Sequence, residues 1–191
     1  MDAMDGNRLV QLMRTGDPSG FDAVYERYAK ALFRTAFLIC GDTGDAEDAV
    51  QETFVICFTS ISQLRHEESL RFWLYRILTR AARDISRRHA RETADEHIAE
   101  RVDEELCRDG SMTAIEAYDD HEAFEQWLEH LSPVQREVVV LRYHDDMSIA
   151  DIAQMLDCRE GTVKSRLHAA RRKLRKAVER GEEQGYAYQR G

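Results

Sequence analysis

The last helical segment of the chain carries basic side chains with the spacing of a DNA-contacting helix. Its apolar residues recur at intervals of three and four, as one helix face requires, at Val163, Leu167, Ala170 and Leu174. The other faces then present Lys164, Ser165, His168, Arg171 and Arg172. Lysine and arginine can bond guanine edges or phosphates, and serine can bond either. A basic face can also be merely solvated, but the helix before it disfavours that interpretation.

That preceding helix is short and begins with a capping signal. Ser148, with Asp151 three residues later, is typical of a helix N-terminus. The apolar residues of this helix are Ile149, Ile152, Ala153 and Leu156. A break at residues 157–159 separates it from the basic helix. Two short helices joined by a tight turn, the second of them basic, predict a helix-turn-helix.

Two stripes of like charge occur in the N-terminal half. Asp45, Asp48 and Glu52 share one face of a helix predicted over residues 45–61. The next predicted helix carries arginines at helical spacing, namely Arg76, Arg80, Arg83 and Arg87. By itself each stripe fits a solvated surface as well as a binding site, and Trp73 fits the core better than a DNA wedge. The residue types alone leave both interpretations open.

Three predicted helices position these stripes. Asp17-Pro18, an N-cap followed by proline, begins the first helix. Its apolar stripe comprises Phe21, Val24, Tyr25, Tyr28, Leu32 and Ala36. Residues 41–44 end the first helix. The predicted inner face of the second helix comprises Val50, Phe54, Cys57, Phe58 and Ile61. After a polar connector over residues 62–68, the inner face of the third helix comprises Trp73, Leu74, Ile77, Ala81 and Ile85. One helical domain therefore ends near Arg91.

A second helical domain begins at a capping box, in which Ser132 is the N-cap, Pro133 the first helical residue and Gln135 the partner. The acidic segment between the domains has few large apolar groups, so it buries too little surface to offset its ordering entropy. The expected architecture is all-α. It has two small helical domains (1–91 and 122–180), a flexible acidic linker (92–121) and a C-terminal tail (181–191).

Local charge explains how a chain of 191 residues with a net charge of −9 could bind DNA. From Glu92 to His130, fourteen acidic residues oppose two basic ones. Residues 71–91 and 159–176 instead carry net charges of +6 and +7. Local rather than net charge decides where a polyanion docks, so the two basic segments remain candidates for DNA binding.

Several classes of protein are excluded by what the sequence lacks. No apolar run approaches the roughly 18 residues of a membrane span, and the acidic N-terminus has no signal-peptide core, so we expect a cytoplasmic protein. The cysteines have no metal-ligand spacing. Cys40 and Cys57 are expected to be buried, and a redox role for Cys107 or Cys158 has little support. Without a phosphate-binding glycine motif or a nucleophile signature, we expect no enzyme, no cofactor and no small-molecule substrate.

Longer stretches of the sequence are similar to one family. A resemblance to region two of the extracytoplasmic-function (ECF) sigma factors of bacterial RNA polymerase is carried by residues 45–54 (DAEDAVQETF), 73–77 (WLYRI), Asp84 and Arg87-Arg88. A resemblance to their region four is carried by residues 131–138 (LSPVQREV), 149–153 (IADIA), 161–167 (GTVKSRL) and 170–175 (ARRKLR). The stretches occur in the family's order and cover most of the chain outside the linker.

The resemblance implies a sigma factor that binds core polymerase and directs promoter-specific initiation. The surface that docks on the clamp helices of the β′ subunit would comprise Asp45, Asp48, Gln51 and Glu52. The residues that bind the minus-ten element as a single strand would be Arg65, His66, Trp73, Arg76, Arg80, Arg83, Arg87 and Arg88. Region four would contact the β flap and read the minus-thirty-five duplex through Arg159, Thr162, Lys164, Ser165, Arg166, His168, Arg171 and Arg172.

The chain departs from the family's pattern at a few positions. Leu70 replaces a phenylalanine, and Thr79-Arg80 replaces an Arg-Asn pair that can touch the minus-ten strand. Ala169 replaces an arginine of the recognition helix. Cys158 takes the place of a capping serine, which would weaken that cap by about 1 kcal/mol. These departures bear on which promoter is recognised and leave the predicted function unchanged.

The alternative function is a stand-alone helix-turn-helix regulator whose N-terminal domain binds a ligand or mediates dimerisation. Such a regulator would usually be a dimer that binds duplex DNA by itself. An effector domain has no need of the acidic and arginine stripes, so the sigma-factor hypothesis is preferred. The family resemblance also allows an anti-sigma factor as a partner that masks both DNA-binding domains.

Overall fold

The structure is a computed structural model that describes residues 6–64, 70–92 and 121–183. Every regular element within these ranges is a helix, which confirms the predicted all-α fold. The chain divides into two compact units, residues 1–98 and 99–191, and each is described by itself. Nearly all of the predicted acidic linker lies outside the described residues.

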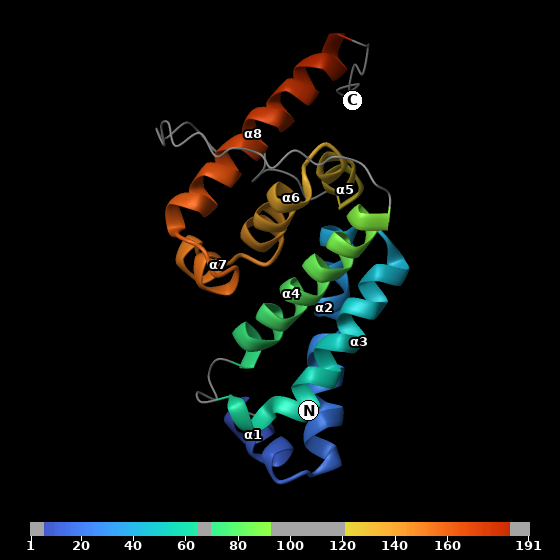
Figure 1. The fold of residues 1–191 in the computed structure, drawn as a ribbon, viewed down its shortest axis with the longest axis vertical. Helices are drawn as coiled ribbons and strands as arrows, with labels where there is room; N and C mark the ends of the chain where they lie inside the picture. Colours follow the sequence, from blue (N-terminus) through green and yellow to red (C-terminus); the bar gives the residue numbers. More distant parts are fainter. Residues whose placement is uncertain (1–5, 65–69, 93–120, 184–191) are drawn as a thin grey trace, which may run out of the picture. The chain divides into compact units, whose positions relative to one another are not determined.

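In the first unit, three long helices pack against one another and a shorter helix packs against the first of them (Figure 1). The described elements are α1 (Gly6–Arg14), α2 (Pro18–Cys40), α3 (Thr43–Ser60), the 3-10 turn η1 (Ile61–Gln63) and α4 (Leu70–Glu92). Most positions of the predicted inner faces are buried, namely Val24, Leu32, Ala36, Phe54, Cys57, Ile61, Leu74, Ile77, Ala81 and Ile85. The predicted positions that are only half-buried are Phe21, Tyr28, Val50 and Trp73, and those that are exposed are Tyr25 and Phe58.

The ends of α2 and α3 follow from local sequence signals. Asp17 caps α2, because its carboxylate accepts hydrogen bonds from the hydroxyl of Ser19 at 2.8 Å and from its N–H at 2.9 Å. The hydrogen bond from the hydroxyl, and after it the one from the N–H, holds the pKa of Asp17 below its ordinary value. Gly41 ends α2 with a left-handed φ of 77°. Asp42 then accepts the N–H of Asp45 at 3.0 Å, so α3 begins two residues earlier than predicted.

Helix α1 precedes the predicted helices and was not expected. It buries Leu9, Val10 and Met13. Their i, i+1, i+4 pattern is the sequence signal that could have revealed this helix. The guanidinium of Arg14 donates a hydrogen bond to the carbonyl oxygen of Leu64, just after η1. Helix α1 therefore contacts both α2 and the segment that follows α3.

Gly20 allows α2 to approach α1 closely. A Cβ at this position would lie 2.7 Å from the Cβ of Leu12 and 2.8 Å from the backbone nitrogen of Met13. Alanine's intrinsic helix preference over glycine is worth about 1 kcal/mol, whereas overpacking costs about 1–3 kcal/mol. We expect Gly20→Ala to lower the free energy of unfolding by about 1 kcal/mol in urea denaturation. Gly161→Ala, whose Cβ would meet no atom within 4 Å, is the control and should not destabilise; a stabilised Gly20→Ala protein would contradict the prediction.

Cys57 is fully buried in the first unit, and burial raises the pKa of its thiol to about 12. Cys40, also expected to be buried, is only half-buried. Because the thiolate is the reactive form, we expect Cys57 to resist iodoacetamide at about pH 8 until the protein unfolds. A variant in which the other three cysteines are serine isolates this thiol, and rapid labelling of its native state would contradict the prediction. Since the unfolded thiol ionises near 9, the free energy of unfolding should fall as pH rises from about 9 to 12.

The second unit contains the predicted helix-turn-helix. Its described elements are α5 (His121–Glu129), α6 (Pro133–Val139), the π-helical turn η3 (Val140–His144), α7 (Ile149–Met155) and α8 (Glu160–Glu183). The oxygen of Gln135 accepts the N–H of Ser132 at 3.2 Å, which is the Gln135 half of the predicted capping box. The hydroxyl of Ser148 accepts the N–H of Asp151 at 3.1 Å, which confirms the second capping signal. Helices α6 and α7 pack on α8, whose inner face buries Val163, Leu167, Ala170 and Leu174.

Candidate nucleic-acid and protein interfaces

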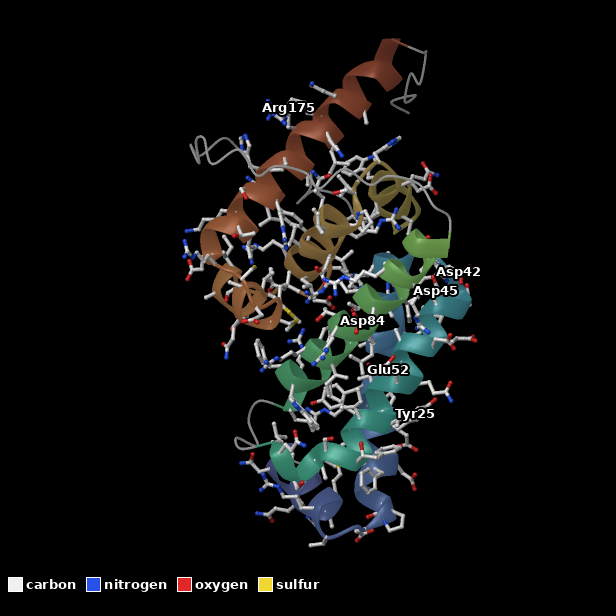
Figure 2. All side chains as sticks on the ribbon, in the orientation of Figure 1. Tyr25, Asp42, Asp45, Glu52, Asp84 and Arg175 are labelled. Carbon is white, nitrogen blue, oxygen red and sulfur yellow. The ribbon has the colours of Figure 1, made fainter. Side chains whose placement is uncertain are left out.

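The acidic stripe lies on the exposed side of α3, except at its first residue. Asp48, Gln51 and Glu52 are exposed. Asp45 is half-buried, and its carboxylate lies 3.3 Å from Nδ1 of His89 on α4. Figure 2 shows Asp45 and Glu52 following one another along α3. Three of the four predicted side chains are thus presented to solvent, and Asp45 is turned toward α4.

An apolar groove of about 640 Å³ lies between α2 and α3. Tyr25 and Val55 in its wall are each 53% exposed, and Phe58 is 42% exposed. The helical spacing of Tyr25 and Phe58 predicted that they lie on inner faces. Instead, the ring of Tyr25 packs 4.9 Å from that of Phe54, and the ring of Phe58 packs edge-on 4.5 Å from that of Phe21, at the surface. The apolar stripes are therefore wider than the arcs that face the core.

The arginine stripe runs along α4. Its exposed members are Arg76, Arg80, Arg87 and Arg88, whereas Trp73 and Arg83 are half-buried. The carboxylate of Asp84 lies 3.5 Å from the guanidinium of Arg87, but both side chains are more than half exposed. Such surface pairs contribute little and exchange readily for other partners. Arg65 and His66, predicted in the same site, lie outside the described residues.

Two of the departures from the family's pattern are core positions. Leu70 is buried, and Thr79 is fully buried with its hydroxyl donating to the carbonyl of Arg76 at 3.2 Å. Neither side chain is presented at the surface. Of the Thr79-Arg80 pair, only Arg80 is exposed.

The predicted DNA-reading residues divide into two groups around α8. Those that are exposed are Arg159, Lys164, His168 and Arg172, and those that are half-buried are Thr162, Ser165, Arg166 and Arg171. The hydroxyl of Ser165 donates to the carbonyl of Thr162 at 3.0 Å, so its remaining capacity toward DNA is as an acceptor. Lys164 lies 3.6 Å from the carboxylate of Glu160 in an exposed pair, which a phosphate can displace.

The start of α8 corrects one expectation. The carbonyl of Arg159 accepts the N–H of Thr162 at 2.9 Å and that of Val163 at 3.3 Å. These bonds place Arg159, rather than Cys158, at the N-cap. A serine in place of Cys158 would therefore not supply the cap that the sequence comparison with the family suggested.

Two contacts around the helix-turn-helix were missed by sequence reasoning. Arg171 donates to the hydroxyl oxygen of Tyr143 through Nη2 at 2.8 Å and Nε at 3.2 Å. Arg142 donates to the carbonyl of Met147 at 2.8 Å and so holds the turn before α7. The first contact spans 28 positions, and no periodic pattern signals it.

The described part of the chain contains no group of His, Cys, Asp or Glu side chains that could hold a metal ion. Among the helices of the same ranges, none is both long and apolar enough to cross a membrane. The surfaces described above are charged or apolar faces of helices, which suit binding to macromolecules.

Known proteins place both units in one class. Residues 24–92 match the family model of sigma-70 region 2, and residues 121–174 match that of sigma-70 region 4. The first match covers most of α2 and all of α3 and α4, and the second covers the helix-turn-helix. The two units thus correspond to two regions of a sigma-70-type transcription factor. The stand-alone regulator is not favoured, because region 2 occupies the unit that would have served as its effector domain.

Whole-chain relatives narrow the class to one family. The ECF RNA polymerase sigma factor SigM of Mycobacterium tuberculosis is 32% identical over 159 residues, which are 83% of this chain and 77% of SigM. SigW of Bacillus subtilis, another ECF RNA polymerase sigma factor, is 27% identical over 185 residues, 93% of this chain and 98% of SigW. The chain belongs to the ECF RNA polymerase sigma factors, which bind core polymerase and promoter DNA.

Two solved structures share this fold. CnrH, in complex with the cytosolic domain of CnrY, matches with a TM-score of 0.64 and 24% identity over 93% of this chain and 98% of CnrH. The sigma factor RpoE of Bartonella quintana, in complex with the anti-sigma factor NepR, matches with a TM-score of 0.62 and 27% identity over 83% of this chain and 96% of RpoE.

Proposed function

We propose that this sigma factor directs promoter-specific initiation through three surfaces, on α3, α4 and α8, without catalysis of its own and in the cytoplasm. The observation that carries the proposal is the basic, exposed face of α8 behind a capped helix-turn-helix. We assign residues 1–91 to the domain that binds core and the minus-ten element, and residues 122–180 to the domain that binds the minus-thirty-five element. Residues 92–121 link them, apart from the helix ends at Glu92 and His121, and residues 181–191, of which the first three continue α8, form a tail.

The α3 surface would bind core polymerase through charge and apolar contact together. Gln51 belongs to the predicted docking surface and also lines the groove, so the exposed acids Asp48 and Glu52 continue into an apolar wall. A helical partner with a basic edge and apolar side chains is complementary to both features. The clamp helices of β′, which the family resemblance names, are the partner that we assign to this surface.

The α4 surface would follow single-stranded minus-ten DNA. Exposed arginines spaced along one helix can neutralise successive phosphates of a strand. Trp73, half-buried on the same helix, offers part of its ring to an unstacked base. We assign Arg65 and His66, in the connector before α4, to the same site on the strength of the family resemblance.

The α8 surface would enter the major groove of the minus-thirty-five duplex. Arg159 and Lys164 lie at the start of the helix, where recognition helices contact base edges, and Arg172 lies farther along on the exposed side. A specific base contact discriminates by about 1–3 kcal/mol. Contacts to phosphates would set the register of the helix on the duplex.

The test is transcription with purified core polymerase, this protein and a library of genomic promoters. We expect specific start sites that depend on the protein, and their shared upstream sequences would identify both promoter elements. A protein that fails to bind core but binds duplex DNA by itself would contradict the proposal and favour the stand-alone regulator.

An anti-sigma factor is proposed as a further partner. The motivation is RpoE of Bartonella quintana, which was solved in complex with the anti-sigma factor NepR. A cognate anti-sigma factor should compete with core polymerase for this chain. Simultaneous binding of such a protein and core to the same molecule would contradict that role.

A further inference from the structure

Tyr143 lies in a turn that directs its side chain toward the recognition helix. In η3 the N–H of Asp145 bonds the carbonyl of Val140, five residues earlier, at 3.2 Å. This wider, π-helical turn follows α6 directly. π-Helical turns occur often at functional sites because they redirect single side chains. Here the turn brings the Tyr143 hydroxyl within 2.8 Å of Nη2 of Arg171 on α8.

The hydrogen bonds between Arg171 and Tyr143 leave the O–H of Tyr143 available as a donor. Arg171 donates to Oη of Tyr143 through two nitrogens, because a guanidinium has donors only. The phenol therefore acts as an acceptor, and its own proton points elsewhere. Among the residues that the structure describes, none accepts that proton. Since Tyr143 is half-buried, its O–H can reach an acceptor outside the domain.

We propose that the hydroxyl of Tyr143 donates a hydrogen bond to a promoter phosphate beside α8, and that Arg171 is a positioning residue that holds and polarises this hydroxyl. The proposal rests on the proposed function of α8. The contact is a hydrogen bond, and no proton is transferred. This role differs from the direct DNA contact that the sequence predicted for Arg171.

The position of the pair supports a phosphate rather than a base as the acceptor. Lys164, His168 and Arg171 follow one flank of α8 at spacings of four and three. Recognition helices direct their first turns at base edges, while the elements beside them meet the phosphates that border the groove. Donation from a cationic guanidinium also strengthens the phenol as a donor, because linked hydrogen bonds polarise one another. A charged acceptor is the one to which such a donor binds most strongly.

The test compares wild-type and Tyr143→Phe holoenzyme on an upstream duplex taken from a promoter selected by this holoenzyme. Phenylalanine removes only the hydroxyl, so we expect affinity for the duplex to fall about tenfold while binding of the protein to core is unchanged. Each phosphate of the duplex is then replaced singly by a neutral methylphosphonate. One replacement should weaken the wild type much more than the Tyr143→Phe variant, which identifies the acceptor.

The salt dependence of binding separates this contact from a cationic one. The slope of log affinity against log salt should be the same for Tyr143→Phe as for the wild type, because the lost donor is neutral. Arg172→Ala, which removes an exposed cation beyond the first turns of α8, should instead reduce the slope by about 0.9. Arg171→Lys keeps the charge but not the paired donors. Its affinity for the duplex should therefore no longer fall when the phosphate that Tyr143→Phe identifies is replaced by methylphosphonate.

Two results would overturn the proposal. One is unchanged affinity of Tyr143→Phe, and the other is equal sensitivity of wild type and variant at every methylphosphonate. A wild-type holoenzyme that selects no promoter would instead refute the proposed function and this inference with it. A lower melting temperature of Tyr143→Phe alongside the second of these results would show that the hydroxyl serves only stability.

Discussion

Replacement of both Asp48 and Glu52 by lysine is expected to abolish co-elution of the protein with core polymerase. Both side chains are exposed on α3 beside the apolar groove, so the change should leave the helical core intact. It turns an acidic face into a basic one. Like charges brought together at an interface cost several kcal/mol, which is enough to reduce a micromolar or nanomolar affinity by several orders of magnitude. Size-exclusion chromatography of the mixture with core polymerase measures the effect.

A matched control is available in the second unit. Glu125 and Glu129 on α5 are exposed and have the same spacing of four. Their replacement by lysine changes the net charge by the same amount but does not touch the α3 surface. This control should still co-elute with core. Retained co-elution of the Asp48/Glu52 variant, or equal loss in both variants, would contradict the assignment of the α3 surface.

Loss of Lys164 and Arg172 together is expected to reduce promoter-specific initiation by roughly a hundredfold while association with core persists. Both side chains are exposed on α8. Each contact to a base or phosphate is worth about 1–3 kcal/mol, or about tenfold or more in affinity. Arg172 is a cleaner choice than Arg171, because removing Arg171 would also remove the bonds to Tyr143. Run-off transcription and co-elution with core, measured side by side, separate the two activities.

The control for this second prediction lies on the same helix. Lys176 is exposed on α8, a turn beyond Arg172 and farther from the end that would enter the groove. Lys176→Ala should leave initiation close to that of the wild type. Equal losses in Lys176→Ala and the Lys164/Arg172 variant would indicate a diffuse electrostatic effect. Loss of core binding by the Lys164/Arg172 variant would contradict the assignment of α8 to DNA binding.

The parts of the fold that were predicted correctly depend on signals a few residues apart. The cap at Asp17, the capping signals at Ser132 and Ser148, and the inner face of α8 are all local patterns. A helix needs only such patterns to be recognised when its apolar residues repeat over several turns. The short α1 was missed because a nine-residue helix offers barely two repeats, with Leu9 and Met13 as its main evidence.

The parts of the candidate sites that were missed depend on contacts between distant residues. The stripe that contains Asp45 is regular, yet His89 on another helix turns that residue away from the exposed group. Arg171 was grouped with its neighbours on α8, although Tyr143 engages it from another element. Tyr25 fits an inner stripe by spacing, and only the packing of α2 on α3 shows that its position faces outward. Periodicity predicts on which face of a helix a residue lies, but not which residue of another element contacts it.

The contact between α1 and the residue after η1 joins α1 to the segment that leads into the proposed minus-ten site. Arg14 holds the carbonyl of Leu64, and Leu64 is the last described residue before the connector to which Arg65 and His66 belong. A residue outside the three proposed surfaces thus holds the last described residue before that connector. Because the proposed minus-ten site includes that connector, we expect changes in α1 to alter how readily this sigma factor melts a promoter and to leave its affinity for polymerase and for the closed duplex unchanged. Natural variation in α1 would then tune the output of a promoter without changing which promoter is chosen.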